Sequence, residues 1–146
     1  MNLCYLGLGS NQKFPERQVR QAIESIKKIR STAVLKVSSL YWNKAWGLQV
    51  QQDFCNVIVE IVTQLPPQLL LKCCREIEKK QGRIRKRRWG PRTLDIDIIL
   101  YGSRTINTHN LCIPHPLMTA RDFVLTPLLE INPNIKLTHD VESTTL

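Results

Sequence analysis

The chain has no run of about 18 apolar residues, the length that a helix needs to cross a bilayer. Its opening segment has no basic lead and no long apolar stretch, so it does not resemble a secretory signal. We therefore expect a cytoplasmic protein with no membrane partner.

Paired cysteines are missing as well. The chain has five cysteines, an odd number, and no Cys-x-x-Cys pair. This pattern excludes a disulfide framework and a cysteine-based zinc site. We expect the five side chains to be buried or chemically indifferent thiols. They are Cys4, Cys55, Cys73, Cys74 and Cys112.

Internal repeats and low-complexity linkers are also lacking. Aromatic and β-branched residues are spread along the chain, which argues against disorder. A length of 146 residues with 42% hydrophobic residues suits one domain with an ordinary core. We therefore predict a single domain over residues 1–146.

Positive charge, in contrast, is abundant. The net charge is +9, and six of the 21 Lys and Arg residues fall within residues 83–92, which read RIRKRRWGPR. A basic surface attracts nucleic acid, anionic lipid or polyphosphate ligands. Composition alone does not separate a solvated loop from a polyanion contact.

The hydrophobic pattern predicts an alternation of strands and helices. Strands are expected over residues 2–8, 33–41, 53–63 and 93–101, and helices are expected to begin at Pro15 and at Pro66-Pro67, the second ending at Gly82. This order is that of the split βαβ arrangement. We therefore predict an α+β fold: a ferredoxin-like βαββαβ antiparallel sheet with two helices on one face. A C-terminal helical extension over 117–131 is expected to cover part of the other face.

Two of the expected strands place polar side chains on that second face. Because strand residues two apart share a face, Phe54 and Asn56 project together from residues 53–63. In residues 93–101, Asp95 and Asp97 are expected to face the same way, together with Tyr101. The other face of that strand is expected to carry Leu94, Ile96, Ile98 and Leu100.

Asp95 and Asp97 form the first candidate site. Carboxylates two residues apart on a strand have Cβ atoms roughly 7 Å apart, and like charges this close need neutralisation. Mg²⁺ suits them because it prefers carboxylate and phosphate oxygens together with water. The alternative is a solvated edge strand.

The basic loop is the second candidate site. Arg83, Arg85, Arg88 and Arg92 offer planar guanidinium forks that pair with phosphate oxygens. Trp89 gives the loop an apolar anchor or a flat surface for a ring. The alternative is a nucleic-acid patch, but two carboxylates on the same face favour phosphoryl transfer. There, positioning and electrostatics supply most of the acceleration.

Two further motifs are absent. Residues 7–11, GLGSN, lack the lysine of a phosphate-binding P-loop and do not fit GxGxxG. The last expected strand carries acids where an RNA-binding ferredoxin-like module would carry aromatics. We therefore expect no nucleic-acid partner, although such a module remains the alternative that fold and charge allow.

The longest motif carries a resemblance. Residues 88–102, RWGPRTLDIDIILYG, resemble the signature of 6-hydroxymethyl-7,8-dihydropterin pyrophosphokinases, enzymes of folate biosynthesis. The resemblance covers nearly the whole chain. GLGSN at 7–11, SSLY at 38–41, FCN at 54–56, Glu78 with QGRIR at 81–85, PH at 114–115 and RDF at 121–123 follow in the family's order.

The resemblance implies a reaction. ATP is the pyrophosphoryl donor, the hydroxymethyl group of a reduced pterin attacks the β-phosphorus, and AMP leaves. The small-molecule substrates would be the two partners of a protein that can work as a monomer. Two Mg²⁺ ions would be bridged by Asp95 and Asp97.

The resemblance also implies a set of site residues. The catalytic group would be Arg83, Arg92, Asp95 and Asp97. The ATP contacts would be Arg75, Glu78, Arg85, Trp89, Arg92, His115 and Arg121. The pterin contacts would be Asn43, Trp46, Phe54, Asn56 and Phe123, with the two phenylalanines stacking on the ring.

The chain departs from the family pattern in places. Residues 42–47 read WNKAWG where a Thr-Pro-Pro-like stretch is more usual, so Asn43 and Trp46 are expected to line the pocket instead. Arg75 stands where many members carry Gln, and Asn110 and Pro116 replace an Arg and an aromatic residue. A degenerate relative that binds pterin or ATP without transfer is therefore a second alternative.

Overall fold

The computed structural model describes residues 1–44, 53–82, 93–116, 118 and 122–135. Its elements alternate much as the hydrophobic pattern predicts. They are β1 (Asn2–Ser10), α1 (Pro15–Lys27), β2 (Thr32–Val37), β3 (Tyr41–Asn43), β4 (Phe54–Thr63), α2 (Pro67–Lys80), β5 (Asp95–Tyr101), β6 (Ile106–Thr108), β7 (Leu111–Ile113) and α3 (Asp122–Ile131).

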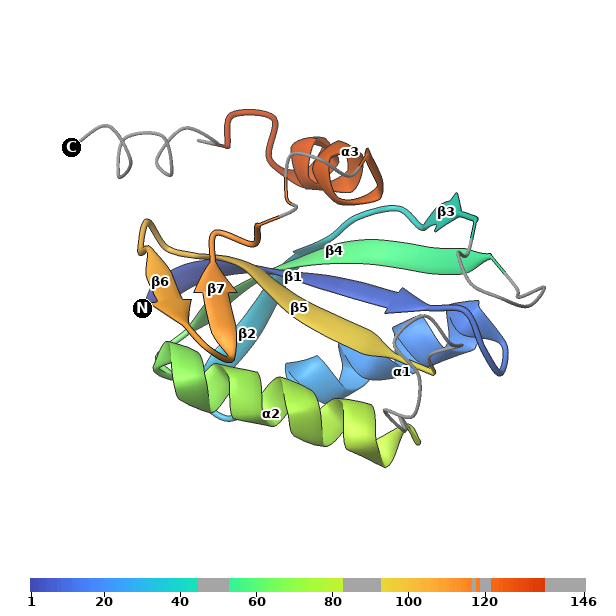
Figure 1. Ribbon diagram of the computed structural model, residues 1–146, viewed down its shortest axis with the longest axis horizontal. Coiled ribbons are helices and arrows are strands. Elements are labelled where there is room, and N and C mark those ends of the chain that lie inside the picture. The colour runs from blue at the N-terminus through green and yellow to red at the C-terminus, as the bar shows by residue number, and fades with distance from the viewer. Residues whose placement is uncertain (45–52, 83–92, 117, 119–121, 136–146) are drawn as a thin grey trace.

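The main sheet has five strands in the order β2-β4-β1-β5, and β3 pairs with the beginning of β4 (Figure 1). Every pairing in this sheet is antiparallel. Strand β1 therefore lies between β4 and β5, the two strands predicted to carry the site. Strands β6 and β7 form a separate antiparallel hairpin. An α+β fold with an antiparallel sheet is thereby confirmed.

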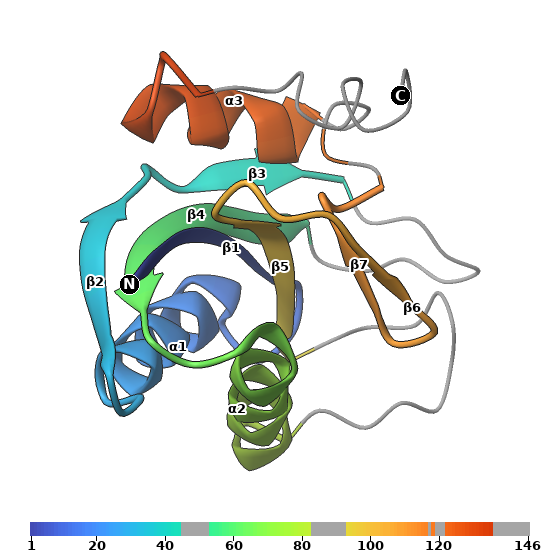
Figure 2. The same cartoon turned by 90° about the vertical axis from the view of Figure 1, so that its left-hand side faces the viewer.

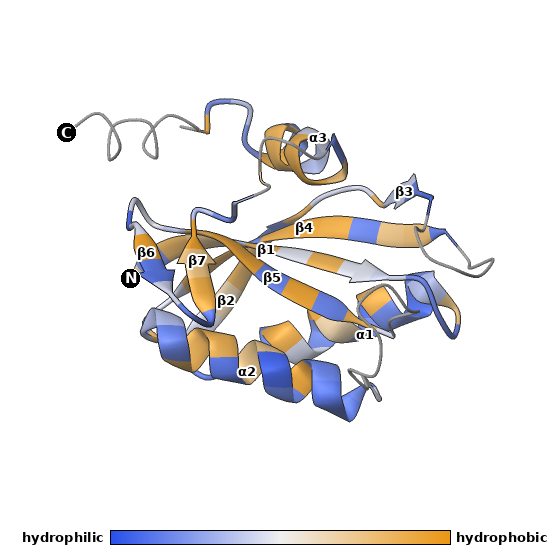
Figure 3. Ribbon diagram, viewed as in Figure 1, coloured by the Kyte–Doolittle hydropathy of each residue, from blue (hydrophilic) through white to orange (hydrophobic). Residues whose placement is uncertain are grey.

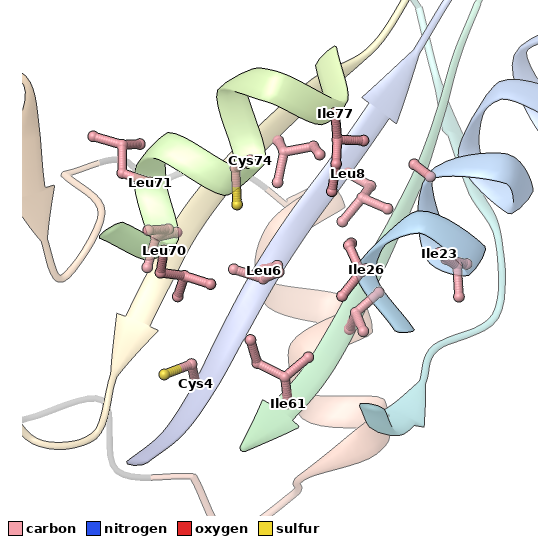
Figure 4. Close-up of a cluster of buried hydrophobic side chains, with 14 of the residues drawn as sticks. Cys4, Leu6, Leu8, Ile23, Ile26, Ile61, Leu70, Leu71, Cys74 and Ile77 are labelled. Atoms are coloured by element: carbon pink, nitrogen blue, oxygen red, sulfur yellow. The ribbon is translucent and has the colours of Figure 1, made fainter. Parts of the chain in front are cut away.

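Helices α1 and α2 cover one face of the sheet (Figure 1). Each begins with a proline, whose fixed φ suits the first helical turn. Ile23 and Ile26 of α1 and Cys74 and Ile77 of α2 lie on the buried stripe of their helix, at the three- or four-residue spacing of one face. Figure 4 shows these side chains gathered over β1, where Leu6 is fully buried.

Helix α3 lies on the opposite face, close to β3 and β4 (Figure 2). A second, smaller apolar cluster joins it to the sheet. Tyr5, Ile58 and Leu100 from the sheet pack there with Val124 and Leu128 of the helix. The face predicted to be open is thus covered by α3 along part of its length.

Three element predictions need correction. The strand expected over residues 33–41 is divided at 38–40, because the buried Ser38 pairs with Ile58 through its backbone and accepts from the N–H of Ile58 through its hydroxyl. The helix expected over 117–131 is not continuous, since Met118 lies in a turn, and its described part runs over Asp122–Ile131. The β6–β7 hairpin was not predicted, since its strands have three residues each and show too little alternation.

A β-bulge in β5 also changes the predicted alternation. Leu6 pairs with Ile98 and Tyr5 with Leu100, so Ile99 is the extra residue between them. Beyond the bulge the faces exchange. Leu100 therefore lies in the α3 cluster and Tyr101 in the cluster under α1 and α2, the reverse of the prediction for both.

Three of the five cysteines, Cys4, Cys55 and Cys74, are buried as expected, whereas Cys73 is partly buried and Cys112 is exposed. All five lie in the described parts of the chain and are free thiols. Burial raises the pKa of Cys4 and Cys74 to about 12 and that of Cys55 to about 11, so these thiols stay protonated and unreactive at neutral pH. Among the described helices, none has the length and apolar character that a membrane span requires.

Candidate active site

The candidate site lies on the α3 face, where β1 passes between β4 and β5. Gly9 of β1 is paired in register with Asn56 on one side and Asp95 on the other, and Gly7 is paired with Asp97. Figure 3 shows hydrophilic bands interrupting β4 and β5 towards the same end of the sheet. The structure therefore brings Asn56 and both aspartates around the glycines of β1.

The two glycines differ in what covers them. A Cβ at Gly7 would meet the Cδ1 atoms of Ile99 and Ile58 at 3.3 and 3.5 Å, so apolar side chains close over this position. A Cβ at Gly9 would stand 3.0 Å from Oδ1 of Asn56. The apolar cover thus ends between the two residues. Without a side chain, Gly9 leaves the backbone approachable by a flat ligand beside Asn56.

The carboxamide of Asn56 is held in one orientation. Its Nδ2 donates to the backbone oxygen of Tyr41 at 3.2 Å and makes a short hydrogen bond to Oδ1 of Asn43. The backbone oxygen of Tyr41 can only accept a hydrogen bond, so the atom of the Asn56 amide that faces it must be the nitrogen. The oxygen Oδ1 of Asn56 is thereby directed over Gly9 as a hydrogen-bond acceptor. Asn56 as a whole is only 7% exposed.

Aromatic side chains come from two elements beside this amide. Phe54 begins β4 and is half-buried. Phe123 lies in the first turn of α3, half-buried, and packs against the α3 cluster. That the two rings stack on opposite sides of one ligand ring stays a prediction.

The carboxylates lie on the other side of β1. Asp95 and Asp97 are both half-buried, and the side chain of Asp97 is 45% exposed. Nε2 of His115 lies 3.9 Å from Oδ2 of Asp97. Within the described residues, no group of three or more His, Cys, Asp and Glu side chains gathers as in a resident metal site. Two accessible carboxylates fit Mg²⁺ ions that take their remaining ligands from phosphate and water.

The bulge in β5 explains why His115 is there. The backbone N–H of His115 donates to the carbonyl oxygen of the extra residue, Ile99, at 2.9 Å, and its own carbonyl accepts from the N–H of Met118 at 3.0 Å. A bulge frees such a carbonyl from the strand ladder. His115 is therefore docked on β5 at a residue two positions from Asp97.

A side-chain pair from α2 secures the strand between the two aspartates. Oε2 of Glu78 accepts from the backbone N–H of Ile96 at 2.7 Å, and Arg75 donates to the carbonyl oxygen of Ile96 at 2.8 Å. The two side chains also form an ion pair at 2.9 Å. We expected both to contact ATP; in this structure they engage the outer edge of β5 and so fix the backbone that carries Asp95 and Asp97.

Seven of the predicted site residues lie outside the described residues. They are Trp46, Arg83, Arg85, Arg88, Trp89, Arg92 and Arg121. Their assignments to ATP, pterin and catalysis stay predictions. Asn110, a further departure from the family pattern, exchanges hydrogen bonds with Gln68 and so ties the hairpin to α2.

Other residues that shape the site were not predicted as site residues. Gly9 leaves space above the backbone of β1. Tyr41 supplies the backbone oxygen that accepts from Asn56, and Ile99 supplies the bulge carbonyl that accepts from His115. The glycines carry a readable signal, since glycine within a strand often marks close approach to a ligand. Tyr41 and Ile99 act through backbone atoms, for which the side-chain pattern carries no signal.

Comparison with known proteins shows the family of this chain. The family model described as 7,8-dihydro-6-hydroxymethylpterin-pyrophosphokinase (HPPK) matches residues 5–133. The chain belongs to this family. A 2-amino-4-hydroxy-6-hydroxymethyldihydropteridine pyrophosphokinase of Haemophilus influenzae is 43% identical over 94% of this chain and 86% of its own. Its counterpart in Bacillus subtilis is 45% identical over 89% of this chain and 78% of its own. The pyrophosphokinase activity in folate biosynthesis that the sequence implied is thereby confirmed.

Solved structures agree on the HPPK fold. One described as HPPK-DHPS in complex with substrates superimposes with a TM-score of 0.72 at 15% identity and covers 94% of this chain. The Plasmodium falciparum HPPK-DHPS gives a TM-score of 0.69 at 16% identity. The chain spans only 41% of the length of each, so the likeness concerns the fold of that part alone.

Proposed function

We propose that this chain transfers the pyrophosphoryl group of Mg²⁺-bound ATP to the hydroxymethyl group of 6-hydroxymethyl-7,8-dihydropterin. The observation that carries the proposal is the arrangement around Gly9. A fixed amide acceptor stands on one side and two carboxylates on the other, both on one sheet face, in a chain of the HPPK family. The site that recognises the ring, on β4, and the site that binds the metal, on β5, are then separated only by β1.

The pterin site is assigned to the β4 side. Oδ1 of Asn56 accepts from the ring's N–H groups, and the apolar edge formed by Ile58 and Ile99 marks where the ring must stop. Phe54 and Phe123 supply stacking surfaces, since aromatic faces suit a flat heterocycle. Asn43 acts through its bond to Asn56, and Trp46 is assigned to the same pocket on the family resemblance.

The ATP site is assigned to the β5 side. Asp95 and Asp97 would hold two Mg²⁺ ions, which would neutralise charge on the polyphosphate during transfer. His115, whose Nε2 lies 3.9 Å from Oδ2 of Asp97, would donate a hydrogen bond to a phosphate oxygen. Arg83, Arg85, Trp89, Arg92 and Arg121 are assigned to the nucleotide on the family resemblance.

The described residues account for the acceleration mainly through positioning. The pterin hydroxyl oxygen forms a bond to the β-phosphorus, and the bond from that phosphorus to the oxygen bridging to the α-phosphorus breaks. AMP leaves with that oxygen and its electron pair, and the hydroxyl proton passes to solvent. Holding acceptor and donor on one rigid sheet face converts a bimolecular encounter into an oriented one.

Several finer assignments complete the proposal. The strand order and antiparallel pairing support a ferredoxin-like βαββαβ class for the sheet. We assign residues 1–146 to one domain that works as a monomer in the cytoplasm. These assignments carry no part of the chemistry.

The test is a direct assay. The chain is incubated with ATP, Mg²⁺ and 6-hydroxymethyl-7,8-dihydropterin, and AMP is measured by chromatography. AMP released in equal amount to pterin pyrophosphate supports the proposal. ADP as the nucleotide product would indicate transfer of a single phosphoryl group, and no AMP with any divalent metal would indicate a degenerate relative; either result would sink the proposal.

A further inference from the structure

Glu130, in the last turn of α3, makes more contacts than an exposed glutamate usually does. Its carboxylate accepts from the backbone N–H of Ser39 at 3.1 Å, from the Ser39 hydroxyl at 2.8 Å and from the Tyr41 hydroxyl at 2.7 Å. Charge-assisted hydrogen bonds of this kind are about twice as strong as neutral ones. We call Ser39, Tyr41 and Glu130 the β3 clamp, because they join α3 to the segment that leads into β3.

The β3 clamp connects directly to the amide of Asn56. The residue whose hydroxyl binds Glu130, Tyr41, is the one whose backbone oxygen accepts from Nδ2 of Asn56. Asn43, the other partner of that amide, is the last residue of the same strand, which has only three residues. A shift of β3 would therefore release both partners of Asn56 together.

The clamp also bears on α3. Phe123 precedes Glu130 by seven residues, which is close to two helical turns, so both project from the same side of α3. Helix α3 lies over β3 and β4 (Figure 2), and its buried stripe includes Val124 and Leu128, so Phe123 and Glu130 lie at the margin of that stripe. Glu130 thus fixes the distance between the helix that carries Phe123 and the strand that orients Asn56.

The other polar ties of α3 reach elsewhere. Lys36 of β2 donates to the carbonyl oxygen of Ile131 at 3.2 Å, and Asn132 donates to the Tyr5 hydroxyl on β1 at 2.8 Å. These contacts also hold the helix to the sheet, but neither involves β3. They provide a control that separates anchoring of the helix from positioning of the site.

We propose that Glu130 is a positioning residue for acceptor recognition: its carboxylate holds β3 against α3, so that Asn56 and Phe123 keep the geometry that the pterin ring requires. The inference rests on the pterin site proposed above. It does not make Glu130 a ligand of the substrate. The accepting bonds that lower the pKa of Glu130, from the Tyr41 hydroxyl first and then from Ser39, keep the carboxylate ionised at neutral pH.

Glu130→Gln is the sharpest variant. Glutamine has the same shape, but one of its two terminal atoms is a donor, and it would face donors on Ser39 or Tyr41. We expect KM for the pterin to rise about tenfold, the loss expected from one charge-assisted hydrogen bond. KM for ATP should change by less than about twofold, since the β5 side is untouched. Tyr41→Phe should give a smaller rise in the same direction and add little to Glu130→Gln.

Two variants serve as controls. Lys36→Met removes an α3 tie that does not reach β3, and should leave both KM values unchanged even if the melting temperature falls. Glu130→Asp keeps the charge on a shorter arm and should recover part of the pterin affinity. If Glu130→Gln leaves KM for the pterin unchanged, or if Lys36→Met raises it equally, the inference is wrong.

A binding measurement keeps this test independent of turnover. The same pterin is titrated calorimetrically into wild type and Glu130→Gln in the presence of α,β-methylene-ATP and Mg²⁺. A wild type that releases no AMP but binds the pterin more tightly than the variant would overturn the proposed reaction and support the clamp. Equal affinities would overturn the clamp whatever the assay shows.

Discussion

Strands β4 and β5 flank β1 on either side, yet they present their polar groups in opposite states. On β4, Asn56 is 7% exposed and its amide nitrogen is fully engaged with β3. On β5, the side chain of Asp97 is 45% exposed, and its described neighbour His115 lies 3.9 Å away. The amide on β4 is held by hydrogen bonds within the protein, whereas the carboxylate of Asp97 on β5 is partly exposed to solvent.

This difference fits the two proposed substrates. A neutral flat ring brings little charge of its own, so its selection depends on hydrogen-bonding groups that are already oriented; leaving such groups unpaired is what rejects the wrong ligand. Polyphosphate with Mg²⁺ brings charge and ligands with it, so carboxylates need only be placed and accessible. Variants on the two strands should therefore fail in different ways.

Asp97→Ala should have the largest effect. Removing one of the two carboxylates that would hold Mg²⁺ beside the transferring group should lower kcat by about 10³-fold, the scale of losing one electrostatic stabiliser in a reacting site. KM for the pterin should change little, and the thermal melt should stay cooperative because the side chain is half exposed. Full AMP release by this variant would show that the metal assignment is wrong.

Asn56→Ala should come second and show the opposite signature. KM for the pterin should rise by about 30- to 100-fold, the equivalent of two hydrogen bonds, with kcat at saturation much less affected. Steady-state kinetics with each substrate varied in turn measures both values. An equal rise in KM for ATP would mean that the two strands do not divide the substrates as proposed.

How far the sequence anticipates these two strands also differs. Alternation along β4 holds from Phe54 to Glu60 without a bulge, so its faces follow from a period of two. In β5 the same reasoning assigns Asp95 and Asp97 to the correct face of the sheet but assigns Leu100 and Tyr101 to the wrong faces. The cause is the bulge at Ile99, which depends on tertiary packing. The role of Glu130 depends on contacts with residues 89 and 91 positions away, Tyr41 and Ser39, which no local pattern encodes.

Glu78→Gln should affect stability more than chemistry. The glutamate side chain is 3% exposed and accepts from Ile96 and Arg75, so its loss should lower the free energy of unfolding by about 1–3 kcal/mol. A fall in kcat of a few fold should accompany it as the strand bearing the aspartates loosens. Urea denaturation measures the first and the AMP assay the second.

The matched control is Glu76→Gln, on the exposed side of the same helix, which should change neither quantity. If Glu78→Gln instead raises KM for ATP while stability stays unchanged, Glu78 contacts the nucleotide directly, as the family resemblance implied. That result would mean that the β5 side, like the β4 side, holds groups oriented for its substrate.

The smallest effect concerns pH. The hydrogen bonds from Tyr41 and Ser39 lower the pKa of Glu130 below its ordinary value of 4.5. A carboxyl whose pKa is lower in the folded state stabilises the fold fully above its unfolded pKa, and this contribution is lost as the pH falls through the folded value. The melting temperature of wild type should therefore approach that of Glu130→Gln as the pH falls below 4.5, with the difference constant from there to neutral pH.

Because Glu130 is exposed, the difference in melting temperature should be small and should shrink with added salt. A difference between the two proteins that persists at acid pH would show that the β3 clamp acts through packing, and that the order of the β4 side does not depend on this charge.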